Sequence, residues 1–336
     1  MKQIHHSLIL IILALLTSTS TASGYSFCVD GIYYNKSGSN AIVTYKDDVN
    51  YRSYSGKVNI PEIVSYNGVK YTVTGIGNFA FLYCDSLTEI SLPATISSIG
   101  QSAFWGCESI TAINIPDNVS TIKAMAFHGC LKLSQVNIPK ALTVINESVF
   151  AFCTSLTHID IPDNITAIKE GAFLNSGITS VIIPNSVEVI ENEAFRQCWM
   201  LADVTIGNSV KTIGHYAFIQ CEGLSRVKCL PAIPPTLADE ECFDRRHYTD
   251  VTLEVPSDVV DSYRQAPIWN KFTTIQSINE QPADTNGDGE VNISDINRVI
   301  QMIVKGTYET TGDVNGDGEI NISDINAIID SILHDR

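Results

Sequence analysis

A hydrophobic pattern with an almost constant period runs through residues 71 to 230. Each period contains a phenylalanine that follows a small residue, and the next phenylalanine is the twenty-third residue after it, or the twenty-second in one repeat. These residues are Phe81, Phe104, Phe127, Phe150, Phe173, Phe195 and Phe218. After each one, apolar and polar residues alternate over a short stretch, as they do around Ile113 and Ile115. Such alternation predicts a β-strand with one buried face.

The second half of each period predicts a turn and another short edge. Proline closes most of the strands, residues rich in Asp, Asn and Ser follow, and a second aliphatic pair such as Val119 and Ile122 leads to the next phenylalanine. One coil cannot bury both aliphatic rows by itself, whereas stacked coils bury a continuous core. The period therefore predicts a β-rich solenoid of about seven repeats over residues 71–230. The alternative is a β-sandwich whose strands happen to be evenly spaced.

The strand residues between the buried positions should point away from the core and form a ladder across the sheet. The ladder comprises Glu89 and Ser91, Ala112 and Asn114, Gln135 and Asn137, His158 and Asp160, Ser180 and Ile182, Asp203 and Thr205, and Arg226 and Lys228. Each position taken singly is more simply a solvated side chain, but an extended and varied polar face is typical of macromolecular recognition. His158 and Asp160 could suggest acid–base catalysis, yet no nucleophile and no paired carboxylate accompanies them. We therefore expect a binding protein and not an enzyme.

Six of the nine cysteines occupy one position of the repeat, three residues after the phenylalanine. They are Cys84, Cys107, Cys130, Cys153, Cys198 and Cys221. Such a count in an exported protein suggests a disulfide framework. Equivalent positions of stacked coils, however, lie about 5 Å apart and point the same way, whereas a bridge needs the two Cβ vectors to converge. Buried free thiols are the preferred interpretation, ahead of disulfides and of a metal site.

Residues 1–24 have the layout of a cleavable secretory signal, with Lys2, an apolar run from Leu8 to Leu16 and then small polar residues. A permanent N-terminal anchor is the alternative. No later stretch is apolar enough to cross a bilayer, so we expect a mature chain without a membrane span, secreted or at the cell surface. The net charge of −16 argues against nucleic acid as a partner, because phosphate binding needs clustered Lys and Arg.

Two acidic loops near the C-terminus match each other residue by residue, DTNGDGEVNISD from position 284 and DVNGDGEINISD from position 313. Oxygen-bearing groups recur at the loop positions that surround Ca²⁺ in an EF-hand loop, with glycine at the sharp turn. The predicted ligands of two Ca²⁺ ions are Asp284, Asn286, Asp288, Glu290, Asn292 and Asp295 in the first loop, and Asp313, Asn315, Asp317, Glu319, Asn321 and Asp324 in the second; the two glutamates contribute main-chain carbonyls. A solvated acidic tail is the alternative, but it does not explain why the two loops match residue by residue.

The repeats resemble the BspA-like subfamily of leucine-rich repeats, which occurs in surface and secreted proteins of Bacteroidota. The likeness rests on stretches such as LTEISLPATISSIGQSAFWGC at residues 87–107. Residues 25–70 resemble the N-terminal β cap of that family, and residues 231–278 resemble its C-terminal cap. The resemblance implies adhesion to a host protein or a glycan through the repeat face.

Residues 284–336, which follow a linker at 279–283, resemble a type I dockerin module because each loop is followed by one predicted helix and ends in Asp. The resemblance implies a small all-α domain that binds a cohesin-like partner. The implied contact residues are Ile293, Ser294, Ile300 and Gln301 in the first half, and Ile322, Ser323, Ile329 and Asp330 in the second. Dockerins commonly label polysaccharide-degrading machinery, so a non-catalytic subunit of an extracellular, cellulosome-like assembly is the alternative to an adhesion protein.

Overall fold

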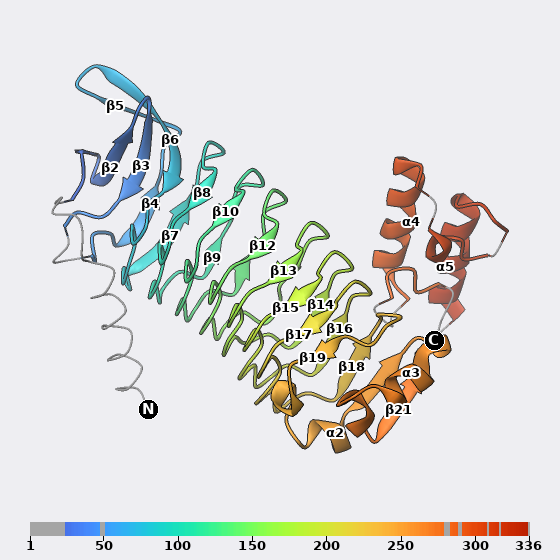
Figure 1. Ribbon diagram of the computed structural model, residues 1–336. Helices are drawn as coiled ribbons and strands as arrows, with labels where there is room; N and C mark the ends of the chain where they lie inside the picture. The colour runs from blue at the N-terminus through green and yellow to red at the C-terminus, as the bar shows by residue number, and fades with distance from the viewer. Residues whose placement is uncertain are drawn as a thin grey trace.

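The computed structural model describes residues 24–47, 51–278, 283–287, 291–307, 309–315 and 317–334. They form a long stack of β coils with a small sheet at its N-terminal end and helices at its C-terminal end (Figure 1). The predicted signal at 1–24 and the linker at 279–283 fall almost entirely outside the described residues. So do the candidate ligands Asp288 and Glu290.

The N-terminal segment is a sheet that closes the first coil of the stack. Its strands are β1 (Phe27–Val29), β2 (Ile32–Ser37), β3 (Asn40–Thr44), β5 (Ile63–Tyr66) and β6 (Val69–Ile76). The strand β4 (Gly56–Asn59) lies in the same segment but pairs with β7 (Leu87–Ser91) of the solenoid. Neighbours β1 and β2, β2 and β3, and β5 and β6 pair antiparallel, whereas β3 pairs with β6 in parallel. β6 then pairs in parallel with β8 of the solenoid, so the cap shares an edge with the stack and covers its end.

The solenoid has two rows of short parallel strands, one on each side of the core. The first row contains β7 (Leu87–Ser91), β9 (Ala112–Ile113), β11 (Gln135–Val136), β14 (Ser180–Ile183), β16 (Asp203–Ile206), β18 (Arg226–Cys229), β20 (Thr252–Val255) and β21 (Thr274–Ser277), and β4 extends it at the N-terminal side. The second row contains β8 (Ser98–Ile99), β10 (Thr121–Ile122), β12 (Val144–Ile145), β13 (Ala167–Ile168), β15 (Val189–Ile190), β17 (Thr212–Ile213) and β19 (Thr236–Leu237). Equivalent repeat residues pair, as Val181, Val204 and Val227 do, which confirms the predicted register.

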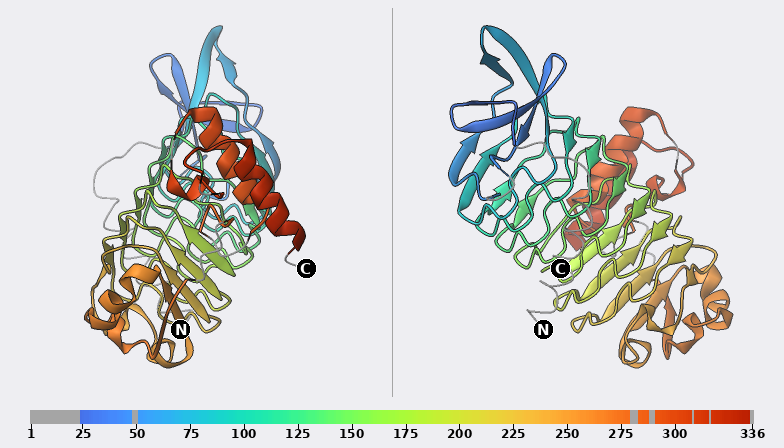
Figure 2. Two further views of the ribbon diagram at one scale, coloured as in Figure 1. Left: turned by 90° about the vertical axis from the view of Figure 1, so that its right-hand side faces the viewer. Right: turned by 60° about the vertical axis from the view of Figure 1, so that its left-hand side comes forward.

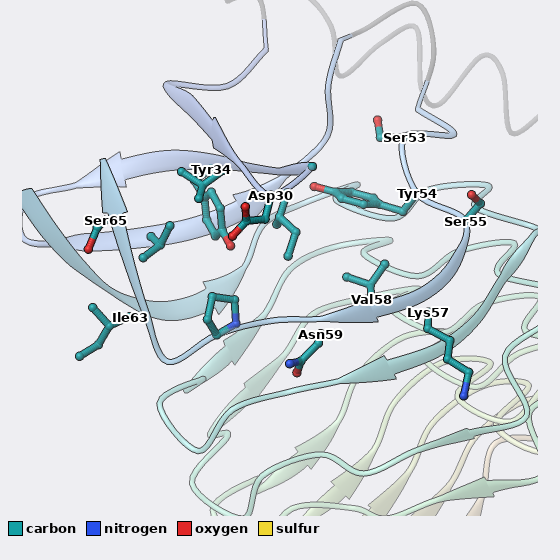
Figure 3. A pocket seen from close by; sticks show the side chains of 15 residues that line it. Asp30, Tyr34, Ser53, Tyr54, Ser55, Lys57, Val58, Asn59, Ile63 and Ser65 are labelled. Carbon is teal, nitrogen blue, oxygen red and sulfur yellow. The ribbon is translucent and has the colours of Figure 1, made fainter. Parts of the chain in front are cut away.

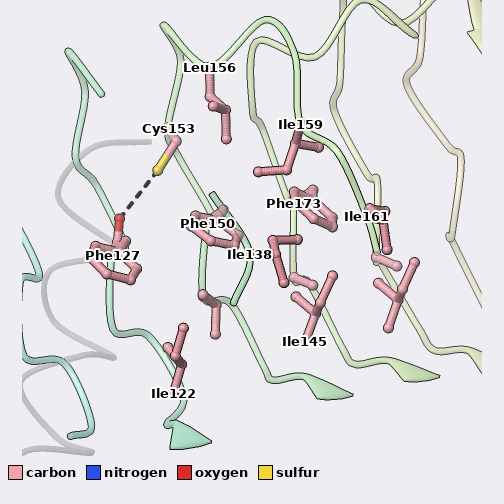
Figure 4. Close-up of a cluster of buried hydrophobic side chains, with 14 of the residues drawn as sticks. Ile122, Phe127, Ile138, Ile145, Phe150, Cys153, Leu156, Ile159, Ile161 and Phe173 are labelled. Atoms are coloured by element: carbon pink, nitrogen blue, oxygen red, sulfur yellow. Dashed lines mark hydrogen bonds between the residues drawn. The ribbon is translucent and has the colours of Figure 1, made fainter. Parts of the chain in front are cut away.

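Stacked phenylalanine rings run along the axis of the solenoid (Figure 4). The ring centroids of Phe104 and Phe127 lie 5.3 Å apart and those of Phe127 and Phe150 lie 5.6 Å apart, with planes within 5° of parallel. The small residue before each ring is buried as well, and the two aliphatic rows pack on either side of the ring column. The recurring phenylalanine is therefore the central element of a continuous core, as its period predicts.

The stack is longer than the seven phenylalanines indicate. Phe243 stacks on Phe218 at 5.2 Å although the interval between them is longer than the regular one, and β18, β20 and β21 continue the first row beyond residue 230. The segment assigned to the C-terminal cap thus continues the parallel stacking. One expected strand of the first row is not formed. Residues 157–161 have no regular strand pairing, although Ile159 and Ile161 are buried in the expected alternation.

All nine cysteines are free thiols, and the six of the ladder are buried, as are Cys229 and Cys242, whereas Cys28 is half-buried. Most repeat thiols donate a hydrogen bond to the carbonyl of the preceding coil's phenylalanine; Cys153 Sγ, for example, lies 3.3 Å from the carbonyl oxygen of Phe127 (Figure 4). Ser176, which takes the cysteine position in the shortened repeat, lies 3.3 Å from Cys198 Sγ. The thiols therefore satisfy backbone carbonyls between coils, which gives this position a structural role.

Burial should make these thiols unreactive. It raises the pKa of Cys153 to about 12 and that of Cys198 to about 11, so the nucleophilic thiolate is essentially absent at neutral pH. We expect a maleimide to label Cys28 alone in the native chain and all nine cysteines after denaturation, as measured by mass spectrometry. Labelling of the repeat cysteines in the native chain at a rate comparable to that of Cys28 would contradict the buried ladder.

Helices gather at the C-terminal end of the chain (Figure 2). The helices α2 (His247–Asp250) and α3 (Val260–Gln265) lie between the last strands of the stack, and α4 (Ile293–Lys305) and α5 (Ile322–His334) follow it. Short 3-10 turns occur at Glu240–Cys242, Ser257–Val259, Trp269–Lys271 and Thr310–Gly312. α4 and α5 pack against each other over a small core in which Ala283, Val299 and Ile328 are buried. None of the helices in the described part of the chain is long and apolar enough to cross a membrane.

Candidate functional site

The outward face of the first strand row carries the polar ladder expected from the sequence. Asn114, Gln135 and Asp160 are exposed, and the buried isoleucines and valines of the same strands alternate with them. A hollow of about 530 Å³ lies on this face and is lined by Ala112, Asn114, Ser134, Gln135, Asn137, His158 and Asp160, among others. Amide, hydroxyl, imidazole and carboxylate groups therefore surround one concave patch, which suits a ligand rich in hydrogen-bonding groups.

Neighbouring ladder residues pair with one another. Arg226 Nε lies 2.7 Å from Asp203 Oδ1, and His158 Nε2 lies 3.0 Å from Asp160 Oδ1. Asn137 is used differently, because its amide bonds both the N–H and the carbonyl of Ile115 at 2.8 Å and so holds two coils in register. Asn137 is thus a structural residue at the edge of the hollow, whereas Asn114 and Asp160 remain available to a ligand.

Lys228 departs from the expected ladder, because its side chain is almost fully buried at 2% exposure. Its Nζ donates a hydrogen bond to the carbonyl oxygen of Gly287, in the first acidic loop, at 3.0 Å. Gly287 has a φ of +76°, and a Cβ there would lie 3.8 Å from Leu230. The expectation that Lys228 faces solvent is therefore wrong, since a loop far along the chain covers it.

The last residues of the two loops, Asp295 and Asp324, are fully buried, and their carboxylates close the loops. Asp295 accepts hydrogen bonds from the N–H groups of Asn286 and Asn292, at 3.0 and 2.9 Å. In the second loop, Asp324 accepts from the N–H groups of Asn315 and Asn321, at 3.2 and 2.8 Å. Each carboxylate therefore ties the beginning of its loop to the start of the following helix, so that the ends of the loop lie close together.

Side-chain oxygens of other candidate ligands accept hydrogen bonds from backbone N–H groups nearby in the sequence. Asp313 Oδ2 accepts from the N–H of Gly318 at 2.9 Å, and Asp284 Oδ1 accepts from the N–H of Gly287 at 2.8 Å. Asn321 caps α5 by accepting from the N–H of Ser323 at 2.8 Å. These bonds join side chains of each loop to backbone N–H groups of the same loop or of the helix that follows it. Carboxylate and amide oxygens are the donors that Ca²⁺ takes, so the donor set fits this ion.

The residues expected to meet a partner lie on the outer surface of α4 and α5. Ile293 and Ile322 are 70% and 71% exposed, and Ile300 and Ile329 are 41% and 38% exposed. Ser294, Gln301 and Asp330 are exposed, while Ser323 is half-buried. Four isoleucines of α4 and α5 therefore lie outside the small helical core and are exposed.

One polar cluster was not predicted from the sequence. His215 forms a short hydrogen bond with Asp239, and its Nε2 lies 3.9 Å from Glu241 Oε2. These groups come from consecutive coils, and they are close enough to hold a metal ion. All three side chains are at least a third exposed and already paired with one another, so we regard them as a solvated ion-pair cluster.

The BspA-type leucine-rich repeat model matches this chain in six copies, over residues 74–202 and 188–279, which together exceed half of the chain. Among solved structures, a leucine-rich repeat protein from Bacteroides ovatus is 25% identical with a TM-score of 0.48, and the match covers 71% of this chain and 57% of that protein. A leucine-rich cell surface protein from Faecalibacterium prausnitzii is 19% identical with a TM-score of 0.46, covering 82% of this chain and 99% of that one.

A leucine-rich repeat protein from Treponema pallidum is 25% identical with a TM-score of 0.43, and the match covers 73% of this chain and 92% of that one. No curated protein sequence matches the chain. The repeat period, the stacked phenylalanines and the family match agree with one another. The chain therefore belongs to the BspA-type leucine-rich repeat family.

Proposed function

We propose that this chain is an extracellular, secreted or cell-surface binding protein whose outward sheet face recognises a host protein or a glycan. The observation that carries the proposal is the exposed polar ladder with its 530 Å³ hollow, built on a rigid stack of buried coils. A rigid scaffold that displays varied polar groups binds at little cost in conformational entropy. Membership of a repeat family whose coils stack into extended faces supports the same function.

We further propose that the two acidic loops each bind one Ca²⁺ and that residues 284–336 act as a dockerin. Among the described residues, one ion would be held by Asp284, Asn286, Asn292 and Asp295. The other would be held by Asp313, Asn315, Asp317, Asn321, Asp324 and the main-chain carbonyl of Glu319. When bound, Ca²⁺ would supply a positive charge that offsets the repulsion among these carboxylates. The buried aspartates Asp295 and Asp324 support this proposal, because Oδ2 of each accepts a single backbone N–H and keeps a lone pair for an ion.

A cohesin-like domain is the partner we propose for the helical surface. Ile293, Ile300, Ile322 and Ile329 are exposed on α4 and α5, whereas Val299 and Ile328 of the same helices are buried. The two helices thus expose isoleucine at matching positions. A partner that covers these side chains accounts for their exposure. The same surface would attach the chain to a polysaccharide-degrading assembly if the partner belongs to one.

An array of plant polysaccharides and host matrix proteins tests the outward face. We expect the full chain to bind at least one class, and the variant Asn114→Ala/His158→Ala/Asp160→Ala to lose affinity by about tenfold or more, because polar contacts in a hollow are lost together. The matched control is Thr121→Ala/Thr212→Ala, which changes exposed residues of the second strand row and should bind as the wild type does.

Binding to polysaccharides alone would favour the assembly subunit, and binding to host proteins alone would favour the adhesion protein. Equal loss of binding in the face variant and in the control would contradict recognition by the outward face. Hydrolysis of any arrayed polysaccharide by the purified chain would contradict the assignment as a non-catalytic protein.

A further inference from the structure

A cleft of about 760 Å³ lies in the N-terminal segment, between the hairpin of β1 and β2 and the strand β4 (Figure 3). Asp30 and Tyr34 line it from the hairpin, Asn59 lines it from β4, and Ile63 and Val64 line it from β5. It is separate from the outward hollow and from the acidic loops. Its volume is within the range of binding sites for small ligands and short peptides.

The wall formed by β4 is a strand edge without a neighbour. Among the described strands, β4 pairs only with β7. The N–H of Gly56 donates to Ser86 and the N–H of Ile60 donates to Ser91, at 2.8 and 3.2 Å, both toward β7. Because alternate residues of a parallel strand turn their backbone groups to opposite sides, the N–H and C=O groups of Lys57 and Asn59 are directed into the cleft.

The remaining walls offer apolar contact and one negative charge. Ile63, which is 54% exposed, lines the cleft from β5, and Val58 lines it from β4. Lys57 Nζ forms an ion pair with Glu89 Oε2 at 2.6 Å. Asp30 is exposed at the tip of the hairpin and makes no ion pair within the described part of the chain. The cleft therefore combines an unpaired strand edge, apolar side chains and a free carboxylate.

We propose that this cleft binds an extended peptide segment of a partner protein, which adds as a strand to the free edge of β4 and places a basic side chain near Asp30. An extended peptide is the ligand whose own backbone repeats donors and acceptors at the spacing of a strand edge. Its side chains alternate, so every second one can contact Ile63 and Val58. Four residues opposite β4 would span about 13 Å. This site is independent of calcium and of the outward face.

A phage-displayed library of random heptapeptides, selected on the full chain, tests the proposal. We expect enriched peptides that carry Lys or Arg. A synthetic copy of the leading peptide should bind Asn59→Pro at least about tenfold more weakly than the wild type, because proline removes an N–H on the free edge and leaves the backbone bonds of Gly56 and Ile60 toward β7 in place. The side-chain bond between Asn59 and Ser91 is lost in Asn59→Pro and in Asn59→Ala alike. Asn59→Ala keeps that N–H and should bind within about twofold, while Asp30→Asn should weaken binding about threefold.

A second readout separates backbone pairing from side-chain contact. The same peptide with N-methyl groups on alternate residues keeps its side chains and should lose at least about tenfold in affinity. The thermal midpoint of Asn59→Pro, compared with that of Asn59→Ala, reports whether the cap has stayed folded. Failure to enrich any peptide, or equal binding to folded Asn59→Pro and to wild type, would overturn the proposal. Binding of cellohexaose that is lost in Asn59→Ala would overturn it in favour of a glycan.

Discussion

Replacing Phe127 with alanine is expected to lower the free energy of unfolding of the solenoid by about 3–5 kcal/mol. The ring is 1% exposed and stacks on Phe104 and Phe150, so the substitution removes contacts to both neighbouring coils and leaves a cavity that the backbone of the stack cannot close. Each coil contacts only its neighbours, so a cavity in the middle of the array weakens two coil interfaces at once. Urea denaturation followed by tryptophan fluorescence measures the loss.

Met200→Ala is the control for this experiment. Met200 belongs to the same repeat array but is 60% exposed, and its truncation should cost less than about 0.5 kcal/mol. Equal losses for the two variants would mean that the phenylalanine column is not the core of the stack.

Removal of calcium by a chelator is expected to unfold α4 and α5 while the β signal of the solenoid persists. Few residues of this segment are buried, so its core alone supplies little stability, and ion binding should contribute most of its folding free energy. Without the ion, the carboxylates of each loop repel one another at close range. Far-UV circular dichroism of the full chain should lose most of its helical component, and excess calcium should restore it.

Magnesium is the natural control for that measurement. It binds with octahedral geometry and few protein ligands, so it should restore much less of the helical signal at the same concentration. A helical signal that the chelator leaves unchanged would contradict the proposal that ion binding folds the tail.

Much of the solenoid could be predicted because its sequence pattern repeats at a fixed period and each repeat is short. The interval between phenylalanines fixes which residues meet across coils, and the alternation around Ile113 fixes which side of the strand is buried. Phe243 escaped the prediction because a proline-rich insertion before it lengthens the interval beyond the regular period. The loss of strand pairing at residues 157–161 could not be predicted, because apolar and polar residues alternate there as they do in the other repeats.

The contacts between distant segments could not be predicted. Lys228 has the same place in the alternation as Thr205 and the exposed Ile182, but it is buried and donates a hydrogen bond to Gly287, far along the chain. The cleft beside β4 depends on where the chain reverses at Asp30, which no repeat pattern specifies. The acidic loops are different, because the candidate ligands of each ion lie within one short loop, so local spacing alone was enough to propose them.

Calorimetric titration of the full chain with calcium tests the central claim most directly, namely that the acidic loops are two metal sites carried by the repeat scaffold. The account predicts uptake of two ions per chain, one per loop. Asp324→Asn should reduce the uptake to one, whereas Asp330→Asn, in the same helix but outside the loop, should leave it at two. No uptake by the wild-type chain, or unchanged uptake by Asp324→Asn, would contradict it.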